Sequence, residues 1–471
     1  MKRRTKIVCT IGPASNRSET LTRLIEAGMD VVRLNFSHGT HREHGQIIRR
    51  VRRLARQQGR NVAVLQDLAG PKIRIGKIKN DLIELKTGEN FILTSRKVLG
   101  TEKEVSVSYS DLPRQVKPRD TLLLADGTLQ LSVIRTSPFD ITCRVIIGGT
   151  LTSHKGVNLP TRTLKLQALT KKDREDLNFG IDRGVDVVAI SFVRKASDAL
   201  SVKKIMNQRK VSIPIIAKIE KHEALDHIDE ILDVVDGAMV ARGDLGIETP
   251  LERIPMVQKM LIRKAIRLGK PVITATQMLR SMVSSPRPTR AEATDIANAI
   301  FDGTDALMLS EETAAGNYPV ESVRMMAKIA RAAEQEFPYD SFQRIDGLSR
   351  EQIPDAVSLG ACFLARKVDA KAIITPTESG LTAHLVSRHK PLHPIIALSP
   401  NHATIRRLAL SWGVIPLLVT RFRDTDDMLS KATRKAKETG IVKPGDRIVL
   451  TAGLPIGIPG ITNMIRIMTI P

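Results

Sequence analysis

The sequence predicts an α/β protein: a (β/α)8 TIM barrel with an inserted antiparallel β-barrel lid domain and a C-terminal open-sheet α/β domain. The barrel rests on two observations. Eight short apolar or β-branched runs alternate with helical patterns, and six stretches place charged or hydroxyl residues just after such a run. Parallel barrels carry their chemistry at the carboxyl ends of their strands, so we expect these residues to form one site.

We expect the barrel to occupy residues 1–71 and 168–338. Its strands are expected at residues 7–11, 31–36, 62–65, 185–192, 213–219, 237–240, 272–275 and 306–309. After the first strand, Ser18 can cap a helix that Gly28 can end. A helix over residues 320–336 closes the barrel, because Phe337 and Pro338 begin a connector.

The other two domains differ from the barrel in pattern. Residues 72–167 alternate polar and apolar side chains without a long helical pattern, which predicts the β lid domain inserted after the third strand. Residues 339–471 are expected to form a C-terminal α/β domain with an open sheet. There a helix is expected at 354–368 and strands at 372–374, 395–398, 414–418 and 447–450.

The composition argues against a membrane protein and against a cysteine-based site. The chain is 42% hydrophobic and 3% aromatic, and no window approaches the roughly 18 consecutive apolar residues of a membrane span. Its basic N-terminus runs into a strand without an apolar signal region, so we expect a cytoplasmic location. Cys9, Cys143 and Cys362 form no C-x-x-C pair, which disfavours structural zinc and disulfides.

The formal net charge of +23 raises nucleic-acid binding as an alternative function. Much of the N-terminal excess lies in residues 42–60, where apolar residues make a helical stripe and arginines fill the other side. A solvated helix face explains that pattern, so we expect no specific nucleic-acid partner.

The richest candidate site spans two consecutive strands. Lys218 and Glu220 fall on one face of their strand by alternation, and Asp244 ends the next strand between Gly243 and Gly246. A snorkelling lysine and helix-capping acids are the alternatives. Together, however, the three side chains offer one cation and two hard carboxylates, which suit Mg²⁺ and a phosphate.

Further candidates stand at other strand ends. Arg33, Asn35 and Ser37 alternate along one strand and its exit, Asp67 ends another, and Arg74 can bring a second guanidinium to an oxyanion.

The hydroxyls of Thr276 and Ser310 also follow strands, where a cap and a site residue are equally good explanations. No Walker A pattern is present, and no G-x-G-x-x-G follows a strand. Bound phosphates would therefore rest on Mg²⁺, arginine and lysine.

Seven longer motifs resemble pyruvate kinase in its bacterial form. They are TIGPAS (10–15), RLNFSHG (33–39), KGVNLP (155–160), IAKIE (216–220), MVARGDLG (239–246), ATQML (275–279) and PRPTRAE (286–292). The resemblance covers essentially the whole chain. It implies a homotetrameric phosphotransferase of glycolysis, which moves the phosphoryl group of phosphoenolpyruvate to ADP.

The resemblance also implies a role for each matching residue. Glu220 and Asp244 would hold Mg²⁺ (or Mn²⁺), while Lys218 would neutralise charge on the phosphoryl group and the enolate. The substrate-binding set would be Arg33, Lys218, Gly243, Asp244 and Thr276; the nucleotide-side set would be Asn35, His38, Arg74 and Lys155. Thr276 and Ser310 would belong to the proton-delivery route.

Departures from the family pattern concern the monovalent cation. In K⁺-dependent members the ion sits near side chains matching Asn35, Ser37 and Asp67. Here Leu68 stands in place of a threonine and Lys72 in place of a glutamate. We expect the Lys72 ammonium to lie near Asp67 and to replace K⁺, so that K⁺ is not required.

A second anion site is expected in the C-terminal domain. The hydroxyl or backbone groups of Thr377, Ser379, Gly380 and Thr382 open a helix, whose N-terminus attracts phosphate. We expect a phosphorylated effector there, either a sugar phosphate or AMP, although an ordinary helix cap is the simpler alternative.

Two other functions stay open at this point. A Mg²⁺-dependent barrel lyase acting on pyruvate or phosphoenolpyruvate would also use a Glu/Asp pair, although it would have no need of a lid for ADP. A polyanion-binding protein would use the positive charge alone.

Overall fold

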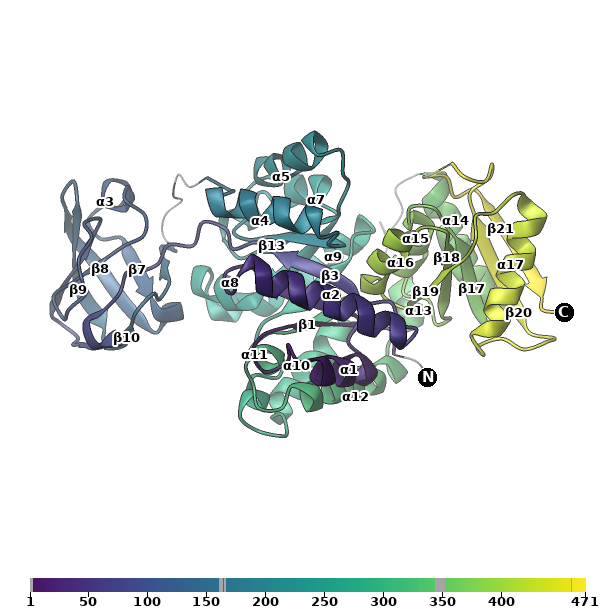
Figure 1. Cartoon of the computed structure of the whole chain (residues 1–471), viewed down its shortest axis with the longest axis horizontal. Coiled ribbons are helices and arrows are strands. Elements are labelled where there is room, and N and C mark those ends of the chain that lie inside the picture. The colour runs from purple at the N-terminus through teal and green to yellow at the C-terminus, as the bar shows by residue number, and fades with distance from the viewer. Residues whose placement is uncertain (1–2, 161–163, 165–166, 344–351, 459) are drawn as a thin grey trace.

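The chain folds into three lobes in a row, with the lid domain at one end, the barrel in the middle and the C-terminal domain at the other end (Figure 1). The computed structural model describes residues 3–160, 164, 167–343, 352–458 and 460–471. Among these residues, no helix is both long enough and apolar enough to cross a membrane.

Eight parallel strands close the central barrel, which confirms the predicted fold class. In chain order they are β1 (Lys6–Thr10), β2 (Val31–Asn35), β3 (Ala63–Asp67), β12 (Val187–Ile190), β13 (Ile215–Ile219), β14 (Gly237–Ala241), β15 (Val272–Ala275) and β16 (Ala306–Leu309). Each pairs with the next barrel strand along the chain, β3 pairs with β12 although the lid is inserted between them, and β16 pairs with β1 to close the barrel. All polar strand-end residues therefore meet at one rim.

Helices surround the barrel and bury its outer face. They are α1 (Ser18–Ala27), α2 (His41–Gln57), α4 (Lys171–Asp182), α5 (Ala196–Gln208), α6 (Glu223–Asp226), α7 (Ile228–Val234), α8 (Arg242–Glu248), α9 (Ile254–Arg267), α10 (Arg290–Phe301), α11 (Glu311–Ala314) and α12 (Pro319–Gln335), with 3-10 turns at Leu251–Arg253 and Arg280–Val283. The predicted cap at Ser18 is wrong, because Ser18 is already helical and Arg17 stands at the cap without a side-chain bond. Gly28 does end α1, at a φ of 119° that disfavours other residues.

The arginine-rich helix α2 has the predicted two faces. Its apolar residues Ile47, Ile48, Val51 and Leu54 are buried, while Arg49 and other arginines are exposed. Arg52 differs from them, since its guanidinium lies 2.6 Å from Asp186. The arginines of α2 thus form mainly a solvated surface, and Arg52 adds a structural ion pair.

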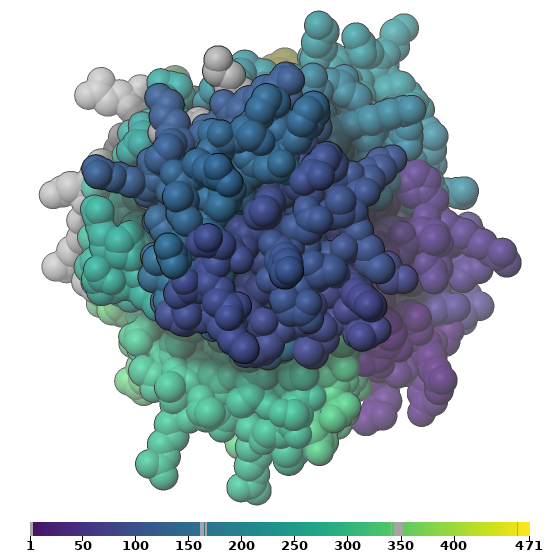
Figure 2. Space-filling view, turned by 90° about the vertical axis from the view of Figure 1, so that its left-hand side faces the viewer, coloured from purple at the N-terminus to yellow at the C-terminus, as the bar shows by residue number. Residues whose placement is uncertain are grey.

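The lid domain consists of two small sheets around their own apolar core. Its strands are β4 (Leu82–Leu85), β5 (Asn90–Thr94), β6 (Glu104–Ser106), β7 (Thr121–Leu124), β8 (Leu129–Thr136), β9 (Asp140–Ile147), β10 (Gly149–Thr152) and β11 (Val157–Asn158), with short helical turns at Lys79–Asp81, Leu112–Gln115 and Ala125–Gly127. Pairing is antiparallel except between β5 and β6. Viewed from its own side, the lid lies in front of the barrel (Figure 2).

The C-terminal domain is a five-stranded α/β sheet in the order β19-β18-β17-β20-β21. Its strands are β17 (Ala372–Pro376), β18 (Ile395–Ser399), β19 (Val414–Leu418), β20 (Arg447–Ala452) and β21 (Met464–Thr469); its helices are α14 (Ile353–Lys367), α15 (Leu381–Arg388), α16 (His402–Arg407) and α17 (Thr425–Glu438), with a 3-10 turn at Leu408–Leu410. Helix α13 (Tyr339–Gln343) lies in the connector from the barrel. The strand β21 was not predicted; it is a largely apolar edge strand that pairs antiparallel with β20.

Candidate active site

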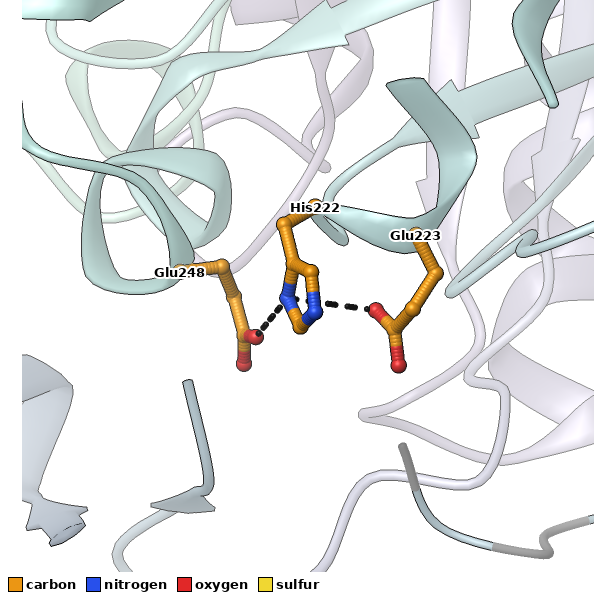
Figure 3. A group of neighbouring side chains, drawn as sticks. All are labelled: His222, Glu223 and Glu248. Atoms are coloured by element: carbon orange, nitrogen blue, oxygen red, sulfur yellow. Dashed lines mark hydrogen bonds and ion pairs between the residues drawn. The ribbon is translucent and has the colours of Figure 1, made fainter. Parts of the chain in front are cut away.

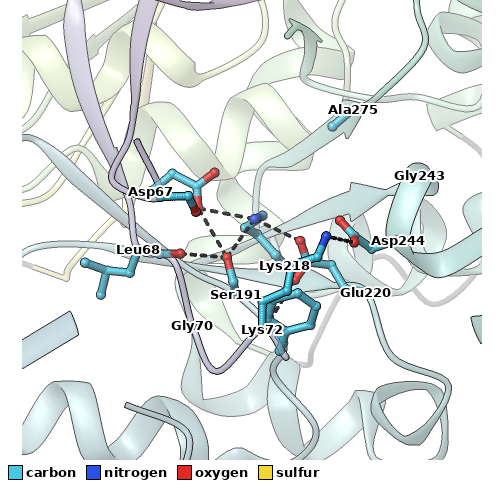
Figure 4. Close-up of polar contacts among 12 residues, drawn as sticks. Asp67, Leu68, Gly70, Lys72, Ser191, Lys218, Glu220, Gly243, Asp244 and Ala275 are labelled. Carbon is cyan, nitrogen blue, oxygen red and sulfur yellow. Dashed lines mark hydrogen bonds and ion pairs between the residues drawn. The ribbon is translucent and has the colours of Figure 1, made fainter. Parts of the chain in front are cut away.

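Lys218 lies at the centre of a buried polar cluster at the barrel rim (Figure 4). Its Nζ lies 2.7 Å from Oγ of Ser191, 2.8 Å from Oε1 of Glu220 and 3.3 Å from Oδ1 of Asp67. Burial lowers the pKa of Lys218, but the charges of Asp67 and Glu220 outweigh burial and raise it. The side chain is therefore a fixed ammonium whose partners come from three strands.

Arg33 supplies a second cation to the same cluster. Its Nε and Nη2 atoms each lie 2.7 Å from Oδ2 of Asp67, and Nη1 donates to Oγ1 of Thr10. Burial raises the pKa of Asp67, yet Lys218 and Arg33 outweigh it and hold that pKa below its usual value. The ionised Asp67 carboxylate thus orients both cations of the site.

Glu220 and Asp244 follow neighbouring strands and fit a divalent metal. Oε2 of Glu220 accepts a hydrogen bond from the backbone N–H of Phe192, which fixes this carboxylate. Burial raises the pKa of Glu220, Lys218 opposes the shift, and the negative charge of nearby Asp244 adds to it. Two buried or half-buried carboxylates that repel one another are a donor set that a hard cation such as Mg²⁺ would relieve.

Lys72 does not lie where we expected it. Its Nζ is 2.9 Å from Oδ1 of Asp244, whereas Asp67 is paired with Arg33 and Lys218. Two cations already satisfy Asp67, so the half-exposed Asp244 is the available partner for a third. Lys72 therefore lies at the candidate metal site and not beside Asp67.

Thr276 is held in position by an unusual backbone. Thr276 and Gln277 adopt φ values of 71° and 57°, a region costly for non-glycine residues. Arg242 donates to the carbonyl of Thr276, and the backbone N–H of Gly243 donates to the Thr276 hydroxyl at 2.7 Å. The predicted substrate residues Gly243 and Thr276 are thus brought together.

Ser310 lies at the exit of β16, as expected, but its local environment is set by Glu312. The buried Glu312 carboxylate accepts from the backbone N–H of Ser310 at 2.7 Å and from that of Leu279 at 3.1 Å. The loops after β15 and β16 are therefore tied together beside Thr276.

The predicted nucleotide-side residues gather only in part. Arg74 donates a hydrogen bond to the carbonyl of His154. The pKa of His38 is lowered mainly by burial and further by the positive charge of Arg74. The N–H of Ile75 donates to the carbonyl of Lys155, next to an isolated β-bridge between Arg74 and Gly156, so Lys155 lies beside Arg74 along the backbone. Asn35 makes a local turn instead, because its Oδ1 accepts from the N–H of Ser37.

Two models of one protein family together match most of the chain. A family model described as "Pyruvate kinase, barrel domain" matches residues 2–323, and "Pyruvate kinase, alpha/beta domain" matches residues 355–468. The chain belongs to the pyruvate kinase family.

Curated relatives agree over the full length of the chain. The pyruvate kinase of Geobacillus stearothermophilus is 49% identical over 100% of this chain and 81% of its own length. That of Clostridium acetobutylicum is 46% identical over 99% of both chains, and pyruvate kinase 2 of Synechocystis is 50% identical over 99% of this chain and 79% of its own. A barrel lyase, the alternative enzyme, is thereby set aside.

Three of the four predicted effector residues, Thr377, Ser379 and Thr382, line one pocket of the C-terminal domain. Helix α15 begins at Leu381, as predicted, after Gly380 with a φ of 98°. The Thr377 hydroxyl accepts from the N–H of Gly380, and that of Thr382 pairs with the Thr462 hydroxyl. Among the described residues that line this pocket, Glu378 is the only charged one.

Sequence reasoning missed three residues that organise the pyruvate kinase site: Thr10, Ser191 and Glu312. Ser191 follows the apolar strand β12 and contacts both Lys218 and the Leu68 carbonyl. A hydroxyl residue directly after an apolar strand was the sequence feature that could have predicted this role of Ser191. Thr10 carries the same signal at the end of β1.

Proposed function

We propose that this chain transfers the phosphoryl group of phosphoenolpyruvate to ADP, giving pyruvate and ATP in the last step of glycolysis. One observation carries the proposal. The ammonium of Lys218 is held between Asp67 and Glu220, next to the second carboxylate, Asp244. A fixed positive charge beside two carboxylates that can hold a divalent metal supports the proposal, because phosphoryl transfer depends on such charges.

The charged residues of the cluster have different roles in binding and stabilising the substrate. Arg33 and Lys218 bind the phosphoryl oxygens, and their positions are preset because Asp67 already holds both cations. Lys218 also stabilises negative charge on the enolate left after transfer. Glu220 and Asp244 would hold Mg²⁺ (or Mn²⁺), which would supply further neutralisation of negative charge on the substrate.

Protonation of the enolate would occur on the side of Thr276. Its hydroxyl is fixed by the Gly243 N–H and the Ala275 carbonyl, so it can hold a water or pass a proton. Ser310 is tied to the neighbouring loop through Glu312 and completes that route.

The nucleotide would bind between the barrel rim and the lid. Arg74 and Lys155 come from the lid side, while Asn35 and His38 follow β2. Closure of the lid over ADP would exclude water, which strengthens every charge interaction in the site.

We also propose that the enzyme does not need K⁺, although Lys72 acts from a different position than the sequence predicted. Lys72 supplies the missing positive charge from the side of Asp244, while Leu68 fills the position next to Asp67 with a buried apolar side chain. The oxygens of Asn35, Ser37 and Asp67 then bind no monovalent ion.

We further propose a homotetramer in the cytoplasm, regulated by a phosphorylated effector, a sugar phosphate or AMP. The effector would contact Thr377, Ser379, Gly380 and Thr382. Because the described lining carries Glu378 and no cation, hydroxyls and backbone N–H groups would have to bind the phosphate.

The proposed activity can be tested by product stoichiometry. The purified chain, incubated with phosphoenolpyruvate, ADP and Mg²⁺, should form pyruvate and ATP in equal amounts and no pyruvate without ADP. Pyruvate formation that does not depend on ADP would contradict the proposal. So would nucleic-acid binding at physiological salt in a protein that lacks turnover.

A further inference from the structure

Three side chains outside the Mg²⁺ pair converge beside the barrel rim (Figure 3). They are His222 and Glu223, which follow β13, and Glu248, which ends α8. Nδ1 of His222 lies 3.4 Å from Oε2 of Glu223 and 3.4 Å from Oε2 of Glu248. One ligand atom from each residue lies within 4.8 Å of the other two.

Hydrogen bonding within the protein leaves this group incomplete. The ring atom Nδ1 carries at most one proton, and it makes its hydrogen bond to Glu248. Oε2 of Glu223 is buried, with the residue only 9% exposed, and it has no hydrogen-bond partner among the residues that the structure describes. This carboxylate oxygen is buried and accepts no hydrogen bond, and it faces an imidazole nitrogen. A positive ion bound between the two would satisfy it.

The rest of the environment leaves the cluster oxygens available. Oε1 of Glu248 is held by Lys221 Nζ at 2.6 Å and by Asn158 Nδ2 at 3.0 Å, so its other oxygen, Oε2, faces His222. The ammonium of Lys221 offsets one of the two carboxylate charges, and one negative charge remains. The His222 side chain is 33% exposed, which leaves a route for an ion and for water.

The spacing suits a small transition-metal ion. A tetrahedral ion with ligands at about 2.1 Å places neighbouring ligand atoms about 3.4 Å apart. An imidazole with two carboxylates favours zinc-type ions over Mg²⁺, which prefers oxygen ligands alone.

We propose that His222, Glu223 and Glu248 bind one divalent transition-metal ion of the zinc class, in addition to the Mg²⁺ of Glu220 and Asp244. Nδ1 of His222 and one oxygen of each carboxylate are the protein ligands, and water completes the coordination. The ion joins the loop after β13 to the end of α8, where Glu248 also contacts Asn158 of the lid.

The test is Co²⁺ and Zn²⁺ binding to the full chain in excess Mg²⁺. The metal-stripped protein is saturated with Mg²⁺ and titrated with Co²⁺, while the visible absorption of protein-bound Co²⁺ and the calorimetric stoichiometry are followed. The titration is repeated with Zn²⁺. Cys9, Cys143 and Cys362 are buried and so do not compete as ligands.

The variants are His222→Gln and the nearly isosteric Glu223→Gln, with His227→Gln as a matched control. His227 is a half-exposed histidine of the same segment that faces only one carboxylate, Glu230, at 3.8 Å. Wild type and His227→Gln should bind one ion per chain more than His222→Gln. Glu223→Gln, whose fold is checked by circular dichroism, should bind that ion at least about tenfold more weakly.

Equal Co²⁺ stoichiometry and absorption in wild type and His222→Gln would overturn the proposal. An unchanged affinity in folded Glu223→Gln would overturn it as well. Neither result depends on turnover, so failure here leaves the proposed kinase activity standing and is distinguishable from its failure.

Discussion

Nζ of Lys72 lies 2.9 Å from Oδ1 of Asp244, so a lysine at the base of the lid pairs with a proposed metal ligand. The same side chain packs against the lid, because a Cβ added to Gly156 would lie 3.0 Å from Cε of Lys72. Binding of Mg²⁺ therefore requires the ammonium to leave or to share Asp244. Lid position, Lys72 and the metal are physically linked through this contact.

Lys72→Met should tighten Mg²⁺ binding in the absence of nucleotide. The substitution keeps most of the apolar stem and removes the cation that competes for Asp244. Both partners are about a quarter exposed, so the ion pair is worth at most about 1 kcal/mol, or about fivefold in Kd. Calorimetric titration with Mg²⁺ measures the change, and an unchanged or weaker affinity would show that Lys72 does not compete with the metal.

The enzyme should need no K⁺. Turnover should be nearly equal in K⁺ and in a bulky organic cation at matched ionic strength, because Lys72 already supplies a fixed charge. Lys72→Glu should lower turnover and make it respond to K⁺. A wild-type enzyme that stays inactive until K⁺ is added would refute this assignment, even if all other roles held.

The barrel and the carboxylate pair Glu220 and Asp244 could be predicted from the sequence, because both follow from local patterns along the chain. Strand alternation alone places Lys218 and Glu220 on one face, and short apolar or β-branched runs mark the eight barrel strands. The position of Lys72 could not be predicted in this way. It depends on Asp67 being already neutralised by side chains of β2 and β13, which is a property of the assembled rim.

Ser191 and the His222 cluster illustrate the same limit. Ser191 gains its role only because β12 lies between β3 and β13, where its hydroxyl reaches Lys218. His222 and Glu248 are 26 residues apart and meet because β13 and β14 are paired, so that the segments that follow these two strands are neighbours. Edge strand β21 was not predicted although its sequence is largely apolar, and its antiparallel place beside β20 is a property of the assembled sheet.

Mg²⁺ affinity should fall with decreasing pH, starting above the ordinary glutamate pKa of 4.5. Burial and the charge of Asp244 raise the pKa of Glu220, so its protonated form, which cannot bind the metal, appears at higher pH than for an exposed glutamate. Mg²⁺ titrations over a pH series give the midpoint. A midpoint at or below 4.5 would contradict the raised pKa.

The effector site should fail when negative charge is placed in it. Ser379→Asp combined with Thr382→Asp should abolish activation by sugar phosphates and by AMP, because the carboxylates repel a phosphate and displace the hydroxyl of Thr382 from Thr462. Basal turnover, measured without effector, serves as the control for folding. Activation that is unchanged for every compound would place the effector elsewhere.

The most direct test of the proposed function is the kcat of Lys218→Met with phosphoenolpyruvate, ADP and saturating Mg²⁺. The long apolar stem remains and only the charge between Asp67 and Glu220 is lost, so the fold should survive while phosphoryl transfer is nearly abolished. Lys195→Met, which removes an exposed lysine near the same rim, is the matched control and should keep wild-type turnover. Retention by Lys218→Met of more than about a tenth of wild-type kcat, a loss below about 1.4 kcal/mol, would contradict the role assigned to Lys218.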